Sequence, residues 1–259
     1  MSVTPAPTAA PLPSIGRLTV AEIFVSLRRG LDDFRAAPQF GLFFSAVYVL
    51  GGFAMVWLGA GHVLWILATS LGFPLIAPFA AVGLYEVSRR LEAGEPLEWP
   101  GILGVVWAER NRQIPWLGAL IVIYFLFWTF LAHMIFALVM GPSALVNITS
   151  SVETLMTPRG LTMIAIEIVV GGVLAYLLFA LTVVSLPLLL DQEIDFVSAM
   201  LLSLSCVRQN LGVMLIWAAV IAVGLFAGIM TAFLGLVVVL PILGHASWHI
   251  YRRALYAPL

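Results

Sequence analysis

The chain has no lysine, a single cysteine and little charge of either sign among its 259 residues. Charged residues make up 10% and apolar residues 62%, whereas soluble globular domains average about 25% and about 45–50%. These values exclude a soluble enzyme. One cysteine excludes a disulfide framework and any cysteine-based metal cluster. The net charge of −1 lacks a basic footprint, so nucleic acid is not an expected partner.

Apolar segments dominate what is present, and six of them are long enough for a helix that crosses the hydrocarbon core, which takes roughly 20 residues. They cover residues 40–58, 63–85, 115–140, 161–190, 211–227 and 231–250. The sequence therefore predicts an all-α, polytopic membrane protein. Residues 1–16 contain prolines and no charged side chain, and we expect a disordered tail there. Residues 17–255 should form one membrane domain.

The arginines predict the orientation of the chain. With both termini on one side of the membrane, that side carries every arginine except Arg159. Cytoplasmic loops carry the excess of basic residues, so both termini should be cytoplasmic. The exclusive use of arginine and the abundance of alanine favour a bacterial source, hence the inner (plasma) membrane.

Three amphipathic segments precede the three expected hairpins, and we expect each to lie in the headgroup plane. Thr19 with Glu22 predicts a capping box for the first, and Asp195 an N-cap for the third. The apolar stripes at helical spacing are Val20, Ile23, Phe24, Leu27, Leu31 and Phe34; then Trp99, Ile102, Leu103, Val106 and Trp107; then Phe196, Val197, Met200, Leu201, Leu204 and Val207.

A repeat of surface helix plus hairpin is suggested by matching residues in the outer hairpins. Pro78, Arg89 and Arg90 recur as Pro241, Arg252 and Arg253 at one constant offset. These four arginines lie beside the bilayer, where guanidinium groups can bind lipid phosphate. Topology setting and ion pairs with neighbouring glutamates are the alternative.

Polar residues inside the expected spans are few. Glu167 and His133 lie at similar depth on consecutive, antiparallel segments, and an intramembrane ionisable residue is a functional hypothesis with a partner expected. His245 and His249 share a helix face and could bind metal or haem. An interfacial, structural position is the stronger interpretation for them. Gly224 and Gly228 form a small-residue motif for helix packing, against either the sixth span or another subunit.

Three stretches carry a resemblance to a known family. They read GLYEVSRRLEAGE at residues 83–95, PLLLD at 187–191 and LGHASWHIYR at 243–252. They resemble an uncharacterised bacterial integral-membrane family, domain of unknown function 2189 (DUF2189), over residues of about 20 to 255. The resemblance implies a polytopic helical fold and no established activity.

The sequence contains no phosphate-binding glycine loop, nucleophile elbow or metalloprotease motif. We therefore expect a protein without catalysis and without a cofactor. Its expected role is that of an accessory, assembly or scaffold protein that binds lipid, anionic lipid in particular, or another membrane complex such as a respiratory one, or further copies of itself. The alternative is a small transporter or channel that uses Glu167 and His133.

Overall fold

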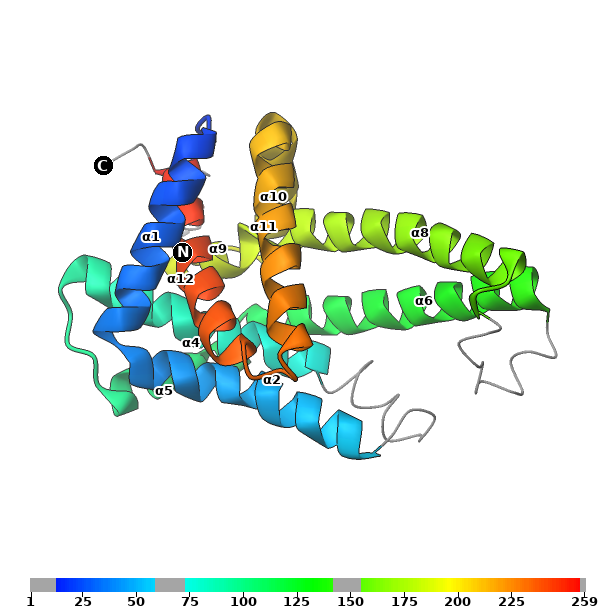
Figure 1. Cartoon of the computed structure of the whole chain (residues 1–259). Helices are drawn as coiled ribbons and strands as arrows, with labels where there is room; N and C mark the ends of the chain where they lie inside the picture. The colour runs from blue at the N-terminus through cyan, green and yellow to red at the C-terminus, as the bar shows by residue number, and fades with distance from the viewer. Residues whose placement is uncertain (1–12, 59–72, 142–154, 257–259) are drawn as a thin grey trace, which may run out of the picture.

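The computed structural model describes residues 13–58, 73–141 and 155–256, and every regular element in these ranges is helical (Figure 1). The all-α prediction is confirmed for them. In chain order the elements are α1 (Val20–Ala36), α2 (Pro38–Leu58), α4 (Phe73–Ala93), α5 (Trp99–Ala108), the short 3-10 helix η2 (Glu109–Asn111), α6 (Ile114–Met140), α8 (Pro158–Thr182), α9 (Ser185–Asp191), α10 (Phe196–Gln209), α11 (Leu211–Met230) and α12 (Leu236–Leu255).

Three candidate membrane spans stand out in the described residues. They are α6, the combined segment Pro158–Asp191 and α11, and they coincide with three of the expected apolar segments. A fourth is possible if α1 and α2, which are bent by 102° at their junction, count as one broken span. The chain is thus an integral membrane protein with several apolar helices.

The expectation of six spans is not met by the described part of the chain. Much of the second expected segment lies outside it, because residues 59–72 are not described. The sixth differs in character: residues 231–235 form turns, and α12 begins at Leu236. With two histidines and two arginines in its second half, α12 falls outside the set of candidate spans.

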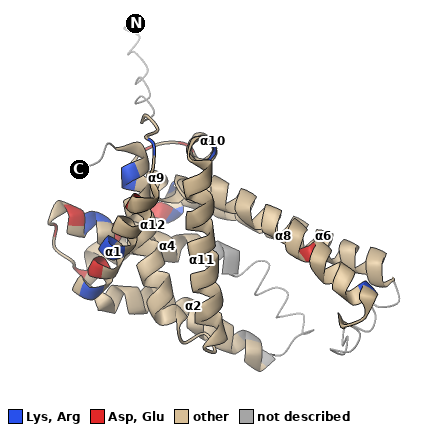
Figure 2. Ribbon diagram, turned by 45° about the horizontal axis from the view of Figure 1, so that its top comes forward, with Lys and Arg blue, Asp and Glu red and all other residues tan. Residues whose placement is uncertain are grey.

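Two regions differ in shape. Helices α6 and α8 lie side by side and extend away from the rest of the molecule as a two-helix arm (Figures 1 and 2). The other region is built around α12, which contacts α1, α2, α4, α9 and α11. Charged residues gather in this region, whereas the arm carries only isolated ones (Figure 2). The polar chemistry of the described residues therefore lies around α12.

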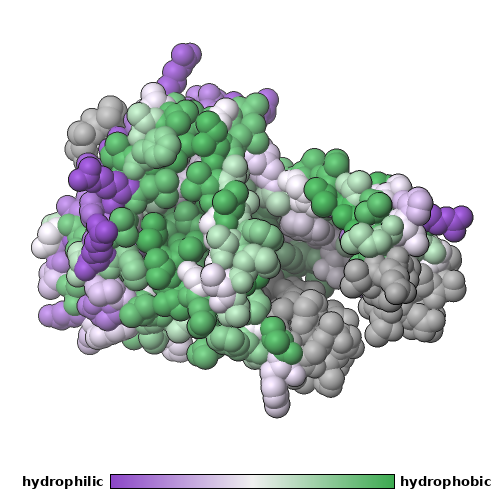
Figure 3. Space-filling view, viewed as in Figure 1, coloured by the Kyte–Doolittle hydropathy of each residue, from purple (hydrophilic) through white to green (hydrophobic). Residues whose placement is uncertain are grey.

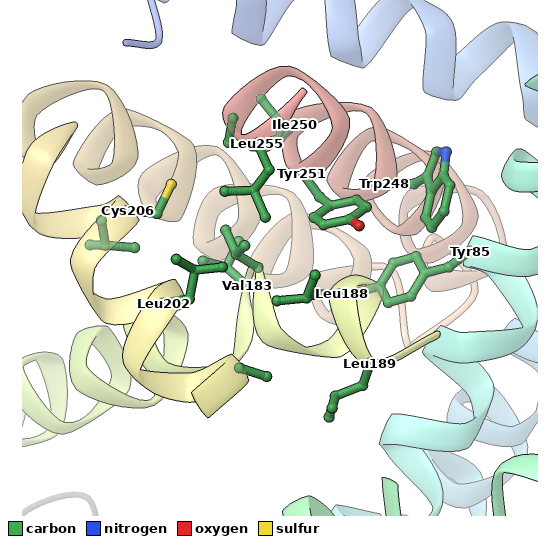
Figure 4. Packing of buried hydrophobic residues seen from close by; sticks show 14 of the residues in the cluster. Tyr85, Val183, Leu188, Leu189, Leu202, Cys206, Trp248, Ile250, Tyr251 and Leu255 are labelled. Carbon is green, nitrogen blue, oxygen red and sulfur yellow. The ribbon is translucent and has the colours of Figure 1, made fainter. Parts of the chain in front are cut away.

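The hydrophobic core joins α12 to α4, α9 and α10. Tyr251 and Trp248 of α12 pack near Tyr85 of α4 and Leu188 of α9 (Figure 4). The Tyr251 hydroxyl donates a hydrogen bond to Asp191 Oδ2 at 2.6 Å. This bond fixes the end of the segment that enters from the arm.

Both predicted caps are confirmed. The Glu22 carboxylate accepts a hydrogen bond from the Thr19 backbone N–H at 2.6 Å. Asp195 accepts one from the Ser198 backbone N–H at 2.9 Å. A hydrogen bond from the Ser198 side chain, and then the backbone bond, hold the pKa of Asp195 below its ordinary value, as expected for a carboxylate at a helix N-terminus.

Helix α1 packs against α12 at Gly30, a small residue outside its predicted apolar stripe. The buried positions of α1 are Ile23, which belongs to that stripe, and Ser26 and Gly30, which do not. A Cβ atom on Gly30 would lie 2.6 Å from the Ile242 carbonyl oxygen and 2.7 Å from the Ala246 backbone nitrogen. The two backbones can approach this closely only because Gly30 has no side chain.

The expected disordered tail lies mostly outside the described residues, but its last residue is fixed. The Gly16 N–H donates to the Ala254 carbonyl at 2.7 Å, and the Gly16 carbonyl accepts from Asn210 Nδ2 at 3.0 Å. Ordered contacts thus begin within the predicted tail of residues 1–16.

Candidate functional site

Helices α1, α4 and α12 bring four polar side chains together inside the region around α12. Ser88 Oγ lies 2.7 Å from Asp33 Oδ2 and 2.8 Å from His245 Nδ1. The same Asp33 oxygen lies 2.8 Å from His249 Nε2. The result is a continuous hydrogen-bonded chain, His249–Asp33–Ser88–His245, which we call the α1–α4–α12 cluster.

The hydrogen bonds of this cluster define where its protons lie. A carboxylate only accepts, so both Ser88 Oγ and His249 Nε2 donate to Asp33. Ser88 has one proton, and it points to Asp33, so Ser88 accepts from the Nδ1–H of His245. The other two ring nitrogens, His245 Nε2 and His249 Nδ1, are buried and have no hydrogen-bond partner.

Burial separates the two ends of the cluster. Ser88 and His245 are fully buried and His249 is almost so, whereas the Asp33 side chain retains 14% of its exposure. The i,i+4 spacing of the histidines places both on one face of α12. The close approach at Gly30 brings Asp33, one turn further along α1, to that face.

The arrangement connects three helices through hydrogen bonds to one carboxylate. Each histidine already directs one nitrogen to Ser88 or Asp33, and no group of three or more His, Cys, Asp or Glu side chains among the described residues is placed to hold a metal ion. The metal and haem interpretation of His245 and His249 gains no geometric support from these contacts.

The four arginines proposed for lipid phosphate contact carboxylates. Glu86, almost fully buried, accepts from Arg89 Nε at 2.8 Å and from Arg90 Nε at 2.6 Å. Arg252 pairs with Glu92 and Asp191, at 3.3 and 3.6 Å, and Arg253 pairs with Glu22 at 3.6 Å. Ion pairs with neighbouring acids therefore occupy all four, as in the alternative interpretation.

Glu167 and His133 lie on the adjacent helices α8 and α6, close enough to interact electrostatically. No ion pair or hydrogen bond joins them. His133 is exposed, and its Nδ1 bonds the Thr129 carbonyl oxygen at 2.7 Å; Glu167 is half-buried. The structure thus brings the predicted pair near each other without direct contact.

Gly224 and Gly228 face α12 of the same chain. A Cβ on Gly224 would lie 3.3 Å from side-chain atoms of Leu243 and Val239, and one on Gly228 would lie 2.6 Å from Leu236 Cδ2. The sequence left open whether this motif packs against the sixth expected span or against another subunit. The structure shows the packing within the chain, against α12.

Sequence reasoning did not identify Asp33 and Ser88 as members of a buried cluster. One pattern could have identified Asp33. Ser26, Gly30 and Ala37 are small residues four and seven positions apart, which is the spacing of a closely packed helix face. Asp33 falls on that face. No comparable pattern marks Ser88.

Comparison with known proteins gives one match. Residues 66–191 match the family described as "Predicted integral membrane protein (DUF2189)". No curated protein and no solved structure matches the chain. The matched segment includes Ser88 and the arginine–glutamate pairs of α4, whereas α1 and α12 lie outside it. Residues 66–191, just under half of the chain, are thus similar to the DUF2189 family of predicted integral membrane proteins.

Proposed function

We propose that the protein is a non-catalytic scaffold or accessory protein, whose apolar helices bind lipid and a second membrane complex. The observation that carries this proposal is the low burial of two of the three candidate spans. Only 6% of the apolar window of α6 is buried inside the protein, and 17% of that of α11, compared with 44% for Pro158–Asp191. Lipid and partner helices are what such surfaces contact in a membrane.

The distribution of polar groups supports the same proposal. Polar side chains around α12 bond to one another, in the α1–α4–α12 cluster and in the arginine–glutamate pairs. Such mutually bonded groups stiffen a structure and leave few ligands for a solute. The surface that faces the viewer in Figure 3 is largely hydrophobic, which suits docking within the bilayer.

We further infer six spans, three surface helices in a threefold repeat, and cytoplasmic termini in a bacterial inner membrane. Helices α2 and α4 have 21 residues each, enough to span. Pro78 in α4 and Pro241 in α12 both lie inside a helix with arginine in its last turn, in keeping with a repeat. Single-cysteine reporters in a Cys206→Ser background test the topology. A membrane-impermeant maleimide should label Arg159→Cys and spare Arg17→Cys in intact cells; the reverse result refutes this orientation.

Co-purification tests the scaffold role. Extraction from native membranes in gentle detergent, followed by mass spectrometry, should recover a stoichiometric membrane complex. Phe127→Ala with Phe130→Ala changes exposed residues of α6, and Val223→Ala with Phe226→Ala is the matched pair on α11. At least one of the two pairs should lose the complex, and the pair that does so identifies the helix that contacts the partner. A chain that purifies without any stoichiometric partner contradicts the proposal.

A small transporter or channel is the second candidate, because Glu167 and His133 lie near each other on α8 and α6. Intramembrane ionisable residues often mark ion pathways. Proton flux into liposomes should then be lost in Glu167→Gln and unchanged in Glu193→Gln, whose side chain is 95% exposed. Equal flux in both variants, or none in the unmodified protein, counts against transport.

A further inference from the structure

A groove lies between α4 and the segment formed by α5 and η2. It has a volume of about 670 Å³ and is lined by Phe79, Leu103, Gly104, Val106, Trp107 and Arg110. This volume is typical of small-molecule sites, which span about 300–1,000 Å³. Apart from Arg110, its lining is apolar. The groove therefore suits an elongated apolar group that ends in a negative charge.

Arg110 differs from the paired arginines of α4 and α12. Its guanidinium stacks on the Trp107 ring at 3.6 Å, and no carboxylate forms an ion pair with it among the described residues. The adjacent Glu109 is bonded to Arg112 instead, at 2.7 Å. Arg110 is exposed at the groove and presents free donors in a geometry that matches phosphate.

The position of Arg110 along the chain indicates its depth in the membrane. It lies in η2, four residues before the candidate span α6 begins at Ile114. Arginine and tryptophan beside the end of a span lie at headgroup level. The abundant anions at that level are lipid phosphates.

We propose that this groove binds a phospholipid, with an acyl chain along Leu103, Gly104 and Val106 and an anionic headgroup phosphate on Arg110. The proposal rests on the membrane function proposed above and makes it specific, since it names a lipid site. It does not depend on a protein partner.

Two variants alter the groove in different ways. Nothing lies within 4 Å of a Cβ added to Gly104, so Gly104→Leu should fill the groove without displacing the backbone. Arg110→Gln removes the charge. Gly212→Leu is the matched control for the first, because its Cβ also meets open space. Arg208→Gln is the control for the second: Arg208 is exposed just before α11 and does not line the groove.

The measurement is native mass spectrometry of the full chain in detergent, with added phosphatidylglycerol, phosphatidylcholine or inorganic phosphate. The unmodified protein should retain phosphatidylglycerol over phosphatidylcholine. Gly104→Leu and Arg110→Gln should each lower the retained fraction at least about fivefold, while both controls keep it. Excess inorganic phosphate should not displace the lipid, since the acyl chain contributes to binding.

Other outcomes overturn the proposal. Equal retention of the two lipids removes the role of Arg110, and displacement by inorganic phosphate makes this a simple anion site. A dimer that Gly104→Leu dissociates would make a second copy the occupant of the groove. This measurement does not depend on recovery of a partner complex. The lipid site and the scaffold role can therefore be refuted independently.

Discussion

The Asp33 carboxylate on α1 lies 2.8 Å from Nε2 of His249 on α12, although 216 positions separate them in the sequence. The same oxygen accepts from Ser88 of α4. One carboxylate thus connects the first described helix to the last and both to a third. The Gly16 N–H, just before α1, donates to the Ala254 carbonyl near the end of α12, so a second hydrogen bond joins the first and last parts of the described chain.

Asp33→Ala should destabilise the protein because it leaves the Ser88 and His249 donors unpaired. An unsatisfied buried donor costs about 1–3 kcal/mol, and we expect a loss of that size or somewhat more. Thermal unfolding in detergent, followed by circular dichroism, measures it. Asp32→Ala is the control, because the Asp32 side chain is 59% exposed and should change stability by no more than about 0.5 kcal/mol. Equal effects of the two would mean that the cluster has no structural role.

Gly30→Ala should separate α1 from α12. Its Cβ would lie 2.6 and 2.7 Å from backbone atoms, which cannot move aside as a flexible side chain can. Overpacking typically costs about 1–3 kcal/mol, and Asp33 should lose its bonds as the helices move apart. Gly212→Ala has open space at the same atom and should stabilise slightly through helix propensity. Unchanged unfolding of Gly30→Ala would refute the close crossing.

The pattern of apolar segments predicts the elements better than it predicts their contacts. Helices α6, α8 and α11 follow from long apolar segments, and Thr19 and Asp195 follow from local cap chemistry. These features depend on neighbours in sequence. The cluster instead depends on a helix crossing between positions more than 200 residues apart, which no local pattern encodes.

The ion pairs of the α4 arginines, unlike the cluster, depend on local spacing. The proximity of these arginines to the bilayer suggested phosphate binding, but Glu86 lies within one turn of both Arg89 and Arg90 and takes their Nε groups. Sequence spacing alone could have indicated these i,i+3 and i,i+4 pairs. The lack of an ion-pair partner for Arg110 among the described residues could not be predicted in this way, because it depends on Glu109 pairing with Arg112.

Glu109→Gln should keep or slightly raise stability at neutral pH, by up to about 1 kcal/mol. Burial raises the pKa of Glu109 against the opposing effect of Arg112, and one of its oxygens is buried without a partner. A raised native pKa means that the folded chain holds this proton more tightly than the unfolded chain. The protonated Glu109 side chain therefore contributes to folding stability below the unfolded-state pKa of 4.5. This contribution is lost as the pH rises through the pKa in the folded protein.

The pH dependence supplies the check on Glu109. Urea unfolding at several pH values should show that the free energy of unfolding of Glu109→Gln increases relative to that of the unmodified protein as the pH rises above about 4.5. Glu86→Gln should instead lose about 1.5–3 kcal/mol at neutral pH, because Glu86 accepts from two arginines. A large loss in Glu109→Gln at pH 7 would show that its pairing with Arg112 outweighs its burial.

Cys206 should resist thiol reagents until the protein unfolds. It is fully buried in α10, and burial raises its pKa to about 11 against the opposing hydrogen bond with Asn210. Because the thiolate is the reactive form, the raised pKa slows the reaction of Cys206 at pH 8, and burial of the sulfur atom slows it further. The matched variant is Cys206→Ser with Ser205→Cys, which moves the only cysteine one residue to an exposed position of the same helix. In detergent, a small maleimide should modify the moved cysteine at least about a hundredfold faster. Comparable rates would mean that Cys206 is not buried in the core, and denaturant should make the two proteins react alike.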